Sequence, residues 1–251
     1  MNLAITGTST LAEATYRNCL REHDAGFGEN VTREPNADTE ILWCCWDTPS
    51  LNGHEPDVNA VMAAIALDLT KTPKGALVIV SSQIPIGTMA YLEAAYKDNY
   101  IFAHIPENVR ARQAEQDFSN QSRIVVGCLN RRYDHIFKRL LSPFTSNIIF
   151  TDPETSEAVK PALNGLLAML IAYINEIAAI CEKEGVDPHV VSNALKTDAR
   201  VSENAPLTPG APYSSGHLER EIHALNALAK KHNLTLPIIQ NIRASNERPR
   251  N

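Results

Sequence analysis

The sequence predicts an α/β domain with a parallel sheet in residues 1–150, followed by an all-helical domain in residues 151–251. Two observations lead to this prediction. Up to residue 150, short apolar runs alternate with helix-like segments, the pattern of a parallel sheet covered by helices on both faces. Beyond residue 150 the strand-like runs stop and one long helical stretch begins. A chain of 251 residues has room for two such domains.

The expected elements of the first domain follow from local patterns. The opening run NLAITG is apolar and ends in Gly, which indicates a strand followed by a turn. The run ILWCCW has the composition of a buried strand, and Val61, Ile65 and Leu69 mark one face of a helix. In chain order we expect strand 2–7, helix 10–22, strand 25–28, strand 41–46, helix 59–69, strand 76–80, helix 87–96, strand 101–105, strand 123–127, helix 131–141 and strand 147–150.

The second domain is expected to be built on one long helix, residues 156–184. Pro161 falls in its expected first turns, where proline is tolerated, and Gly185 follows its end. Because this helix is apolar around most of its circumference, nearly all of its surface must be buried, and we expect a second copy of the chain to cover part of it. Shorter helices are expected at residues 187–195, 218–231 and 237–246, with a Pro-rich loop at residues 202–213.

Composition narrows the class of protein. Hydrophobic residues make up 44% of the chain, as in soluble globular proteins, and a formal net charge of -6 argues against nucleic acid as a partner. The most apolar segment, residues 163–180, is interrupted by Asn164, Asn175 and Glu176, so we expect no membrane span. The start lacks the pattern of a signal peptide. The five cysteines are scattered without metal-ligand spacing, which predicts reduced, mostly buried thiols in a cytoplasmic protein and no metal site.

The segment after the first expected strand is a candidate phosphate loop. Gly7-Thr-Ser9-Thr10-Leu11-Ala12 stands where a Rossmann-like fold places G-x-G-x-x-G/A and binds the pyrophosphate of a dinucleotide. Ser9 replaces the middle Gly, and its side chain can either crowd the phosphates or donate a hydrogen bond to them. Glu29 lies 22 positions after Gly7, the spacing of the acid that binds the ribose hydroxyls of NAD and repels the 2′-phosphate of NADP. An ordinary strand-to-helix turn with a solvated Glu29 is the alternative.

Further motifs are spread over most of the chain. They are WDTP (46–49) with Gly53 and PDVNAV (56–61), SQIPIGT (82–88), PENVR (106–110), DF (117–118) with RIVVG (123–127), EAVKPALN (157–164) with INEIA (174–178), and DAR (198–200). Together they resemble the UDP-glucose/GDP-mannose dehydrogenase family over nearly the whole chain, most strongly in residues 154–201. The resemblance implies NAD as the cofactor, a small-molecule substrate that is a sugar or sugar nucleotide, and a homodimer formed through the helix at residues 156–184.

The resemblance also implies roles for individual residues. In the family a Lys and an Asn four residues apart hold the reacting oxygen, and they match Lys160 and Asn164, which share one face of the expected helix. An ammonium and an amide on one face can stabilise negative charge that develops on an oxygen. A helix-end Lys with an Asn facing solvent is the alternative. The remaining matched site residues are Glu107, in the catalytic site, and Thr48, Pro49, Ser82 and Gln83, in loops that contact the cofactor.

The loop that carries the family's nucleophile departs from the pattern. Residues 211–225 match G-Y-G-G-S-C-F-P-K-D-V-x-A-L at the Tyr and at the final Ala-Leu, but His217 stands in place of the Cys. In the family this Cys forms the thiohemiacetal that allows a second oxidation to the acid, and an imidazole is not a ready substitute for a thiolate. Arg220 replaces the Lys and Glu221 the Asp, so charged groups remain there.

Other departures affect the neighbouring loops and the length. Gln83 replaces the Thr of the family's STVP loop, and Ala111 replaces the second Glu of PEFLRE. The segment before ILWCCW is shorter than in the family, so part of the N-terminal domain is missing. We also expect the family's C-terminal domain, which binds most of the nucleotide part of the substrate, to be missing from this chain.

Two functions from different classes are therefore expected. The first is an NAD-dependent oxidoreductase limited to a two-electron step between an alcohol and a carbonyl. In that reaction Glu221 would move the proton, and His217 would act as an acid–base group or bind the substrate, since the reference pKa of His lies near neutrality. The second is a catalytically inactive relative that binds a nucleotide or a protein partner. A fragment or remodelled chain is a third alternative.

Overall fold

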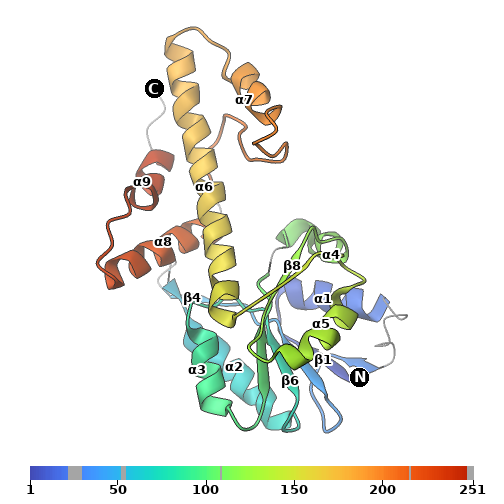
Figure 1. Cartoon of the computed structure of the whole chain (residues 1–251). Helices are drawn as coiled ribbons and strands as arrows, with labels where there is room; N and C mark the ends of the chain where they lie inside the picture. Colours follow the sequence, from blue (N-terminus) through green and yellow to red (C-terminus); the bar gives the residue numbers. More distant parts are fainter. Residues whose placement is uncertain (22–29, 52–54, 108, 215, 248–251) are drawn as a thin grey trace. The chain divides into compact units, whose positions relative to one another are not determined.

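The computed structural model describes residues 1–21, 30–51, 55–107, 109–214 and 216–247. The chain divides into two units. Unit 1 consists of Met1–Leu51 and Pro56–Lys160, and unit 2 of Asn52–Glu55 and Pro161–Asn251. Figure 1 labels many of the helices and strands of the two units.

Unit 1 is built around a seven-stranded sheet with the strand order β2-β1-β3-β6-β7-β8-β9. Neighbouring strands run parallel, except that β7 and β8 are antiparallel and pair at His104 and Gly127. The strands are β1 (Leu3–Thr6), β2 (Val31–Thr32), β3 (Ile41–Cys44), β6 (Leu77–Val80), β7 (Ile101–His104), β8 (Ile124–Gly127) and β9 (Ile148–Thr151).

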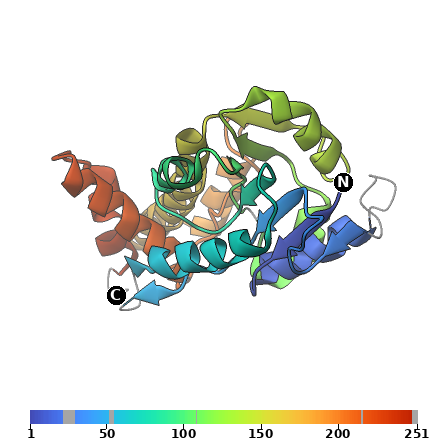
Figure 2. The same cartoon turned by 90° about the horizontal axis from the view of Figure 1, so that it is seen from below.

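Helices cover both faces of this sheet, as Figure 2 shows. Successive side chains of a strand point to opposite faces, so Ile41 and Trp43 of β3 join one buried cluster with α1, α4 and α5, whereas Leu42 and Cys44 join the other with α2 and α3. This two-sided burial is why the central strands read as unbroken apolar runs. The helices are α1 (Thr10–Arg21), α2 (Val58–Lys71), α3 (Thr88–Tyr96), α4 (Ala114–Ser119) and α5 (Asp134–Leu141), with short 3₁₀ turns η3 (Ala111–Gln113) and η4 (Arg131–Tyr133).

The strand order reverses between β1 and β3. The chain passes from β1 to β2 on one side and then starts β3 on the other side of β1. In open α/β sheets, ligands bind outside the carboxyl ends of the strands at such a switch point. The loops that follow β1 and β3 are therefore the expected position of a ligand site.

Unit 2 consists mainly of helices. α6 (Pro153–Lys183), the long helix drawn in yellow and orange in Figure 1, begins in unit 1 and continues through unit 2. Gly165 allows α8 to approach it closely, since a Cβ atom there would lie 3.0 Å from Leu225 Cδ1. The other helices are α7 (Pro188–Lys196), α8 (Gly216–Lys231) and α9 (Pro237–Asn246), and a separate two-stranded sheet consists of β4 (Ser50–Leu51) and β5 (Glu55–Pro56).

The predicted α/β class with a following long helix is confirmed, with local differences. The predicted strand at 25–28 lies outside the described residues, and the described β2 is at Val31–Thr32. α6 begins at Pro153, after Asp152, whose carboxylate accepts a hydrogen bond from Thr155 N at 2.7 Å. Pro161 is therefore the ninth residue of the helix, and the prediction that it lies in the first turns was wrong. α4 was not predicted, and the β7–β8 pair departs from the predicted parallel arrangement.

Candidate functional site

The loops that follow β1, β3, β6 and β7 are held at one edge of the sheet in unit 1. Backbone hydrogen bonds continue past the strand ends: Cys45 N donates to Thr6 O at 2.8 Å, Ser81 N to Cys44 O at 2.8 Å, and Ile105 N to Val80 O at 3.0 Å. Most of the candidate residues of unit 1 lie in these loops, because parallel strands bring their carboxyl ends to the same edge.

The turn after β1 requires a glycine. Gly7 has a φ of +127°, in the region that favours glycine, and a Cβ atom there would lie 2.2 Å from the carbonyl oxygen of Cys45. The turn packs directly against the end of β3, so no side chain fits at this position. Such a tight turn between the first strand and the first helix is what the first glycine of a dinucleotide-binding loop provides.

Ser9 uses its hydroxyl to cap α1. The hydroxyl donates to Cys45 O at 2.8 Å and accepts from Ala12 N at 2.9 Å. Its one proton is therefore already engaged and is not available to a phosphate. Thr10 and Leu11 begin the helix, where backbone N–H groups have no intrahelical acceptor, and these groups remain suited to an anion.

The loop after β6 contains two buried polar atoms without a partner. Among the described residues, neither Ser82 Oγ nor Gln83 Nε2 makes a hydrogen bond. Thr48 Oγ1, in the loop after β3, donates to Gln83 O at 2.6 Å and holds the backbone of the loop after β6. The loop after β3 is itself held by Pro49 O, which accepts from Asp57 N at 2.7 Å. Buried polar groups are rarely left unpaired, so the two atoms fit the polar groups of a bound cofactor.

A Lys–Glu ion pair lies after β7. Lys160 Nζ on α6 is 3.0 Å from Glu107 Oε2, and the two side chains are 15% and 28% exposed. The nearby His104 ring is buried, and its Nδ1 lies 3.0 Å from Ser156 Oγ. Burial, together with the positive charge of Lys160, lowers the pKa of His104 to about 3, so the ring is neutral at physiological pH.

Two further contacts fix the first turns of α6. The carboxylate of Glu157 accepts hydrogen bonds from Gly87 N at 2.6 Å and Met89 N at 2.7 Å, at the start of α3. Gly127 at the end of β8 packs closely on the helix, since a Cβ atom there would lie 2.5 Å from Ser156 Cβ. Burial raises the pKa of Glu157. The first turns of α6, which carry Lys160, are thus held by the end of β7, by the end of β8 and by the segment that follows β6.

The other predicted catalytic residues belong to unit 2. Asn164 follows Lys160 by one turn of α6, His217 is the second residue of α8, and Glu221 is buried in the same helix. Their catalytic roles remain predictions. Glu29, the predicted ribose-binding acid, lies outside the described residues.

Sequence reasoning did not identify Ser156, Glu157 and His104 as supports of the site. Glu157 stands inside the matched motif EAVKPALN, which was a usable signal for it. His104 and Ser156 carried no signal, because their partnership joins positions 52 residues apart.

The cysteines supply no activated nucleophile. All five are buried free thiols, as their scattered spacing predicted. Burial raises the pKa of Cys44, Cys45 and Cys128, which keeps these groups protonated. Within the described parts of the chain, no three His, Cys, Asp or Glu residues are grouped in a way that could hold a metal ion.

The fold and these contacts define a class of protein: an α/β protein with a dinucleotide-type turn at its switch point and a Lys–Glu pair beside it, as in dinucleotide-dependent dehydrogenases. Two family models match the sequence. The NAD binding domain of the UDP-glucose/GDP-mannose dehydrogenase family matches residues 6–145, and its central domain matches residues 154–248. The chain belongs to the UDP-glucose/GDP-mannose dehydrogenase family, and it carries the family's NAD-binding domain.

Individual relatives agree with this assignment. The chain is 30% identical to the UDP-glucose 6-dehydrogenase of Rickettsia felis over 229 residues, which cover 88% of this chain and 51% of the relative. It is 30% identical to that of Bacillus subtilis over 219 residues, covering 84% of this chain and 47% of the relative. The chain thus spans about half the length of the curated relatives it matches.

Solved structures share the fold. A UDP-glucose dehydrogenase from Pyrobaculum islandicum superposes with a TM-score of 0.79 at 19% identity, over 98% of this chain and 67% of that one. The UDP-D-ManNAc dehydrogenase of Pyrococcus horikoshii gives a TM-score of 0.79 at 20% identity, over 99% of this chain and 68% of that one.

Proposed function

We propose that the chain is an NAD-dependent oxidoreductase that carries out one two-electron step between an alcohol and a carbonyl on a sugar or sugar nucleotide. The observation that carries the proposal is the ion pair between Lys160 and Glu107, whose atoms lie 3.0 Å apart. Glu107 follows β7, and Lys160 lies near the start of α6, which Ser156 and Glu157 hold in place. Catalysis needs charged groups that are positioned before the reaction, and this pair meets that requirement.

The proposed chemistry assigns Lys160 to the reacting oxygen. Its ammonium has three N–H donors, and one is engaged by Glu107, so the others can hold a substrate hydroxyl. When the alcohol is oxidised, negative charge develops on the oxygen as its proton leaves, and the ammonium stabilises that charge. The carbon then loses a hydride, and the electrons on the oxygen form the C=O bond. The hydroxyl proton passes to an acid–base group, for which Glu221 is the proposed residue, while Asn164 is proposed to share the oxygen with Lys160. When bound, NAD supplies the ring that accepts the hydride.

The limit to two electrons follows from the missing nucleophile. Oxidation of an aldehyde to an acid by this family's route needs a thiolate at position 217, and this chain has His217. The buried thiols of Cys44 and Cys45 have raised pKa values and do not replace it. The proposed product is therefore the carbonyl compound, with one NADH formed per substrate.

The stoichiometry of NADH tests this proposal. The purified protein is incubated with NAD and UDP-glucose, and NADH is counted against sugar consumed. We expect a ratio of one, and a ratio of two would show the proposal to be wrong. Lys160→Ala should abolish turnover, whereas Glu154→Gln, an exposed acid at the start of the same helix, should leave it unchanged.

An inactive nucleotide-binding or partner-binding relative is the second candidate. It is favoured by His217 at the nucleophile position and by the engaged hydroxyl of Ser9 in the phosphate loop. Calorimetric titration with NAD separates the two candidates. Saturable NAD binding without turnover of any sugar alcohol supports the second candidate, and binding with turnover excludes it.

We propose that α6 pairs with the same helix of a second chain. Leu166, Tyr173 and Ile180 are 48%, 49% and 61% exposed and follow one another at intervals of seven residues. The half-buried Leu170 and Ile177 fill the places between them, which gives the alternating three- and four-residue spacing of a coiled-coil seam. Only 28% of the most apolar part of α6 is buried within one chain.

By length and composition alone, α6 is also apolar enough to cross a membrane. Light scattering at micromolar concentration distinguishes the alternatives. We expect twice the 27.6 kDa of one chain, and the single mass for Tyr173→Glu/Ile180→Glu. Val190→Glu, an equally exposed apolar position on α7, is the control. A monomeric native protein, or one that needs detergent for extraction, would contradict the proposal. The cytoplasmic location predicted from the cysteines stays a prediction.

A further inference from the structure

Arg33 lies at the position where Rossmann-like folds recognise the adenosine ribose. β2 ends at Thr32, and its residues pair in parallel with β1, Leu3 with Val31 and Ala4 with Thr32. Arg33 is thus the first residue beyond the carboxyl end of the strand next to the phosphate-loop strand. An acid near this position binds the ribose hydroxyls of NAD, whereas an Arg accommodates the 2′-phosphate of NADP. Glu29, the predicted acid, precedes β2 in the sequence.

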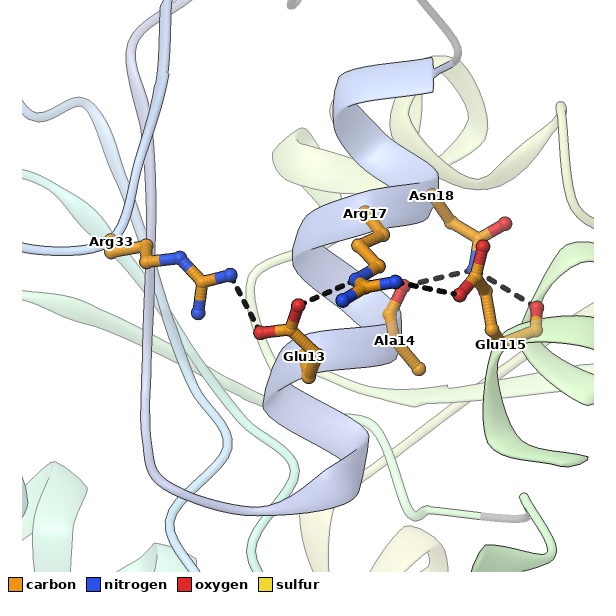
Figure 3. Close-up of polar contacts among 6 residues, drawn as sticks. All are labelled: Glu13, Ala14, Arg17, Asn18, Arg33 and Glu115. Atoms are coloured by element: carbon orange, nitrogen blue, oxygen red, sulfur yellow. Dashed lines mark hydrogen bonds and ion pairs between the residues drawn. The ribbon is translucent and has the colours of Figure 1, made fainter. Parts of the chain in front are cut away.

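The guanidinium of Arg33 is held beside α1 while remaining accessible. Its Nη2 is 2.6 Å from Glu13 Oε2, and its central carbon lies 4.1 Å from the centroid of the Tyr16 ring (Figure 3 shows the contact with Glu13). The side chain is 53% exposed. Since Arg carries donors on three nitrogens and this contact uses one of them, donors remain for a phosphate.

The opposite charges around Arg33 are balanced. Glu13 is also bound by Arg17 at 2.5 Å, and Arg17 reaches Glu115 at 3.6 Å (Figure 3). Both guanidinium groups keep the pKa of Glu13 below its usual range. The next residue along the chain, Glu34, lies 3.5 Å from Lys71 on α2.

These described groups amount to three cations and three carboxylates, so they create no net negative charge. The edge beyond β2 therefore lacks, among its described residues, the excess acid that would repel a 2′-phosphate. A network joined by several ion pairs also holds the Arg33 side chain near one position before a ligand arrives, which lowers the entropic cost of binding.

We propose that Arg33 recognises the 2′-position of the adenosine ribose, and that the cofactor site accepts NADP as well as NAD. The inference rests on the proposed function, because it concerns the same cofactor site. Arg33 keeps Glu13 as its partner through Nη2 and offers its other N–H groups to the 2′-phosphate, which makes charge-assisted hydrogen bonds of the kind that guanidinium groups form with phosphates.

Calorimetric titration of the full chain with NAD, NADP, 5′-AMP and 2′-AMP tests the proposal. We expect Kd values for NAD and NADP within about tenfold of each other, because one charge-assisted contact shifts affinity by about that factor. Arg33→Ala should weaken NADP and 2′-AMP by about tenfold to a hundredfold and change NAD by less than about threefold. Arg33→Gln, which keeps part of the side chain over Tyr16, guards against an effect of misfolding. Arg139→Ala removes the same charge from an exposed position on α5, outside this group of ion pairs, and should leave both Kd values unchanged.

The possible failures are distinguishable. If NAD binds and NADP binds more than about a hundredfold more weakly, the role of Arg33 is wrong while the proposed function stands. If NADP binds equally well to the native protein and to both Arg33 variants, Arg33 is not the recognising residue. If neither dinucleotide binds, the proposed function itself is wrong.

Discussion

Replacing Glu157 by Ala is expected to destabilise unit 1 and to loosen the start of α6. The carboxylate is 1% exposed and accepts hydrogen bonds from two backbone N–H groups 70 and 68 residues away. Met89 is fully buried, so its N–H would have no partner after the substitution, whereas Gly87 is exposed and water can replace the lost acceptor. The two losses are therefore unequal.

The magnitude follows from this inequality. An unsatisfied buried N–H costs about 1–3 kcal/mol, and an exchange of a protein acceptor for water costs about 0.5–1.5 kcal/mol. Together they predict a loss of about 2–4 kcal/mol in the free energy of unfolding for Glu157→Ala. Glu157→Gln keeps one acceptor oxygen and should lose about half of that amount. These losses are large compared with the total stability of a domain.

Urea unfolding followed by tryptophan fluorescence measures this effect selectively. The chain has two tryptophans, Trp43 and Trp46, and both belong to unit 1, so the signal reports that unit. Glu154→Ala, an exposed acid in the first turn of α6, is the matched control. If Glu157→Ala unfolds within about 0.5 kcal/mol of this control, the two hydrogen bonds do not support the site as argued.

The pH dependence gives an independent check. Burial raises the pKa of Glu157 above its ordinary value of 4.5. A raised folded-state pKa contributes stability that is fully present below the unfolded-state pKa and is lost as the pH rises through the folded-state pKa. The native protein should therefore lose stability relative to Glu157→Gln as the pH rises from 4.5. A difference between the two proteins that stays constant over this range would contradict the assignment.

Three further predictions concern the phosphate loop and unit 2. Gly7→Ala should abolish NAD binding in calorimetry, because its Cβ would lie 2.2 Å from Cys45 O; unchanged binding would contradict the described turn. Ser9→Gly should tighten NAD binding, because the N–H group of Ala12 at the start of α1 becomes free for a phosphate. The same change should lower the melting temperature slightly, because α1 loses its cap. Weaker NAD binding would show that the hydroxyl of Ser9 assists the phosphates. Burial and the neighbouring Glu219 raise the pKa of Tyr213 to about 12, so the stability that the neutral phenol contributes should be lost as the pH rises from 10 to about 12. In unfolding experiments Tyr213→Phe should lose less stability than the native protein over this range. Equal losses in the two proteins would contradict the prediction.

The layered fold could be predicted from sequence because its signal is local. β3 shows why: all four residues from Ile41 to Cys44 are buried, two in each apolar cluster, so a run with no polar residue indicates a sheet covered on both sides. α4 was missed because it has only six residues, of which Ala114 and Phe118 are buried. A segment of that length is stabilised by packing and gives little periodicity. The reversal of direction between β7 and β8 has no local signal, since both strands are buried.

The site was only partly predictable for the same physical reason. Lys160 and Glu107 stand in motifs, but their 3.0 Å contact joins positions 53 residues apart and needed the fold to be known. From the sequence, the Ser9 hydroxyl could either crowd the phosphates or donate a hydrogen bond to them. In the structure it donates to the carbonyl of Cys45, 36 residues away, so its proton is not available to a phosphate. The partner of a side chain that caps or bridges distant backbone groups depends on the tertiary fold. The spacing of residues along the chain therefore does not predict such a contact.

The two oxidations of a nucleotide-sugar dehydrogenase place different demands on a protein, and we propose that this chain carries out only the first. Removal of a hydride from an alcohol needs a fixed cation near the oxygen, and Lys160 is held by Glu107, which also belongs to unit 1. Oxidation of the resulting carbonyl needs a thiolate, and position 217, in α8 of unit 2, holds His217. The partners described for Lys160 and the start of α6 are Glu107, His104, Gly87 and Met89, all in unit 1, and exchange of the residue at position 217 changes none of these residues. Loss of the second step therefore does not by itself require loss of the first, which is the physical basis for proposing an alcohol–carbonyl oxidoreductase and not only an inactive relative.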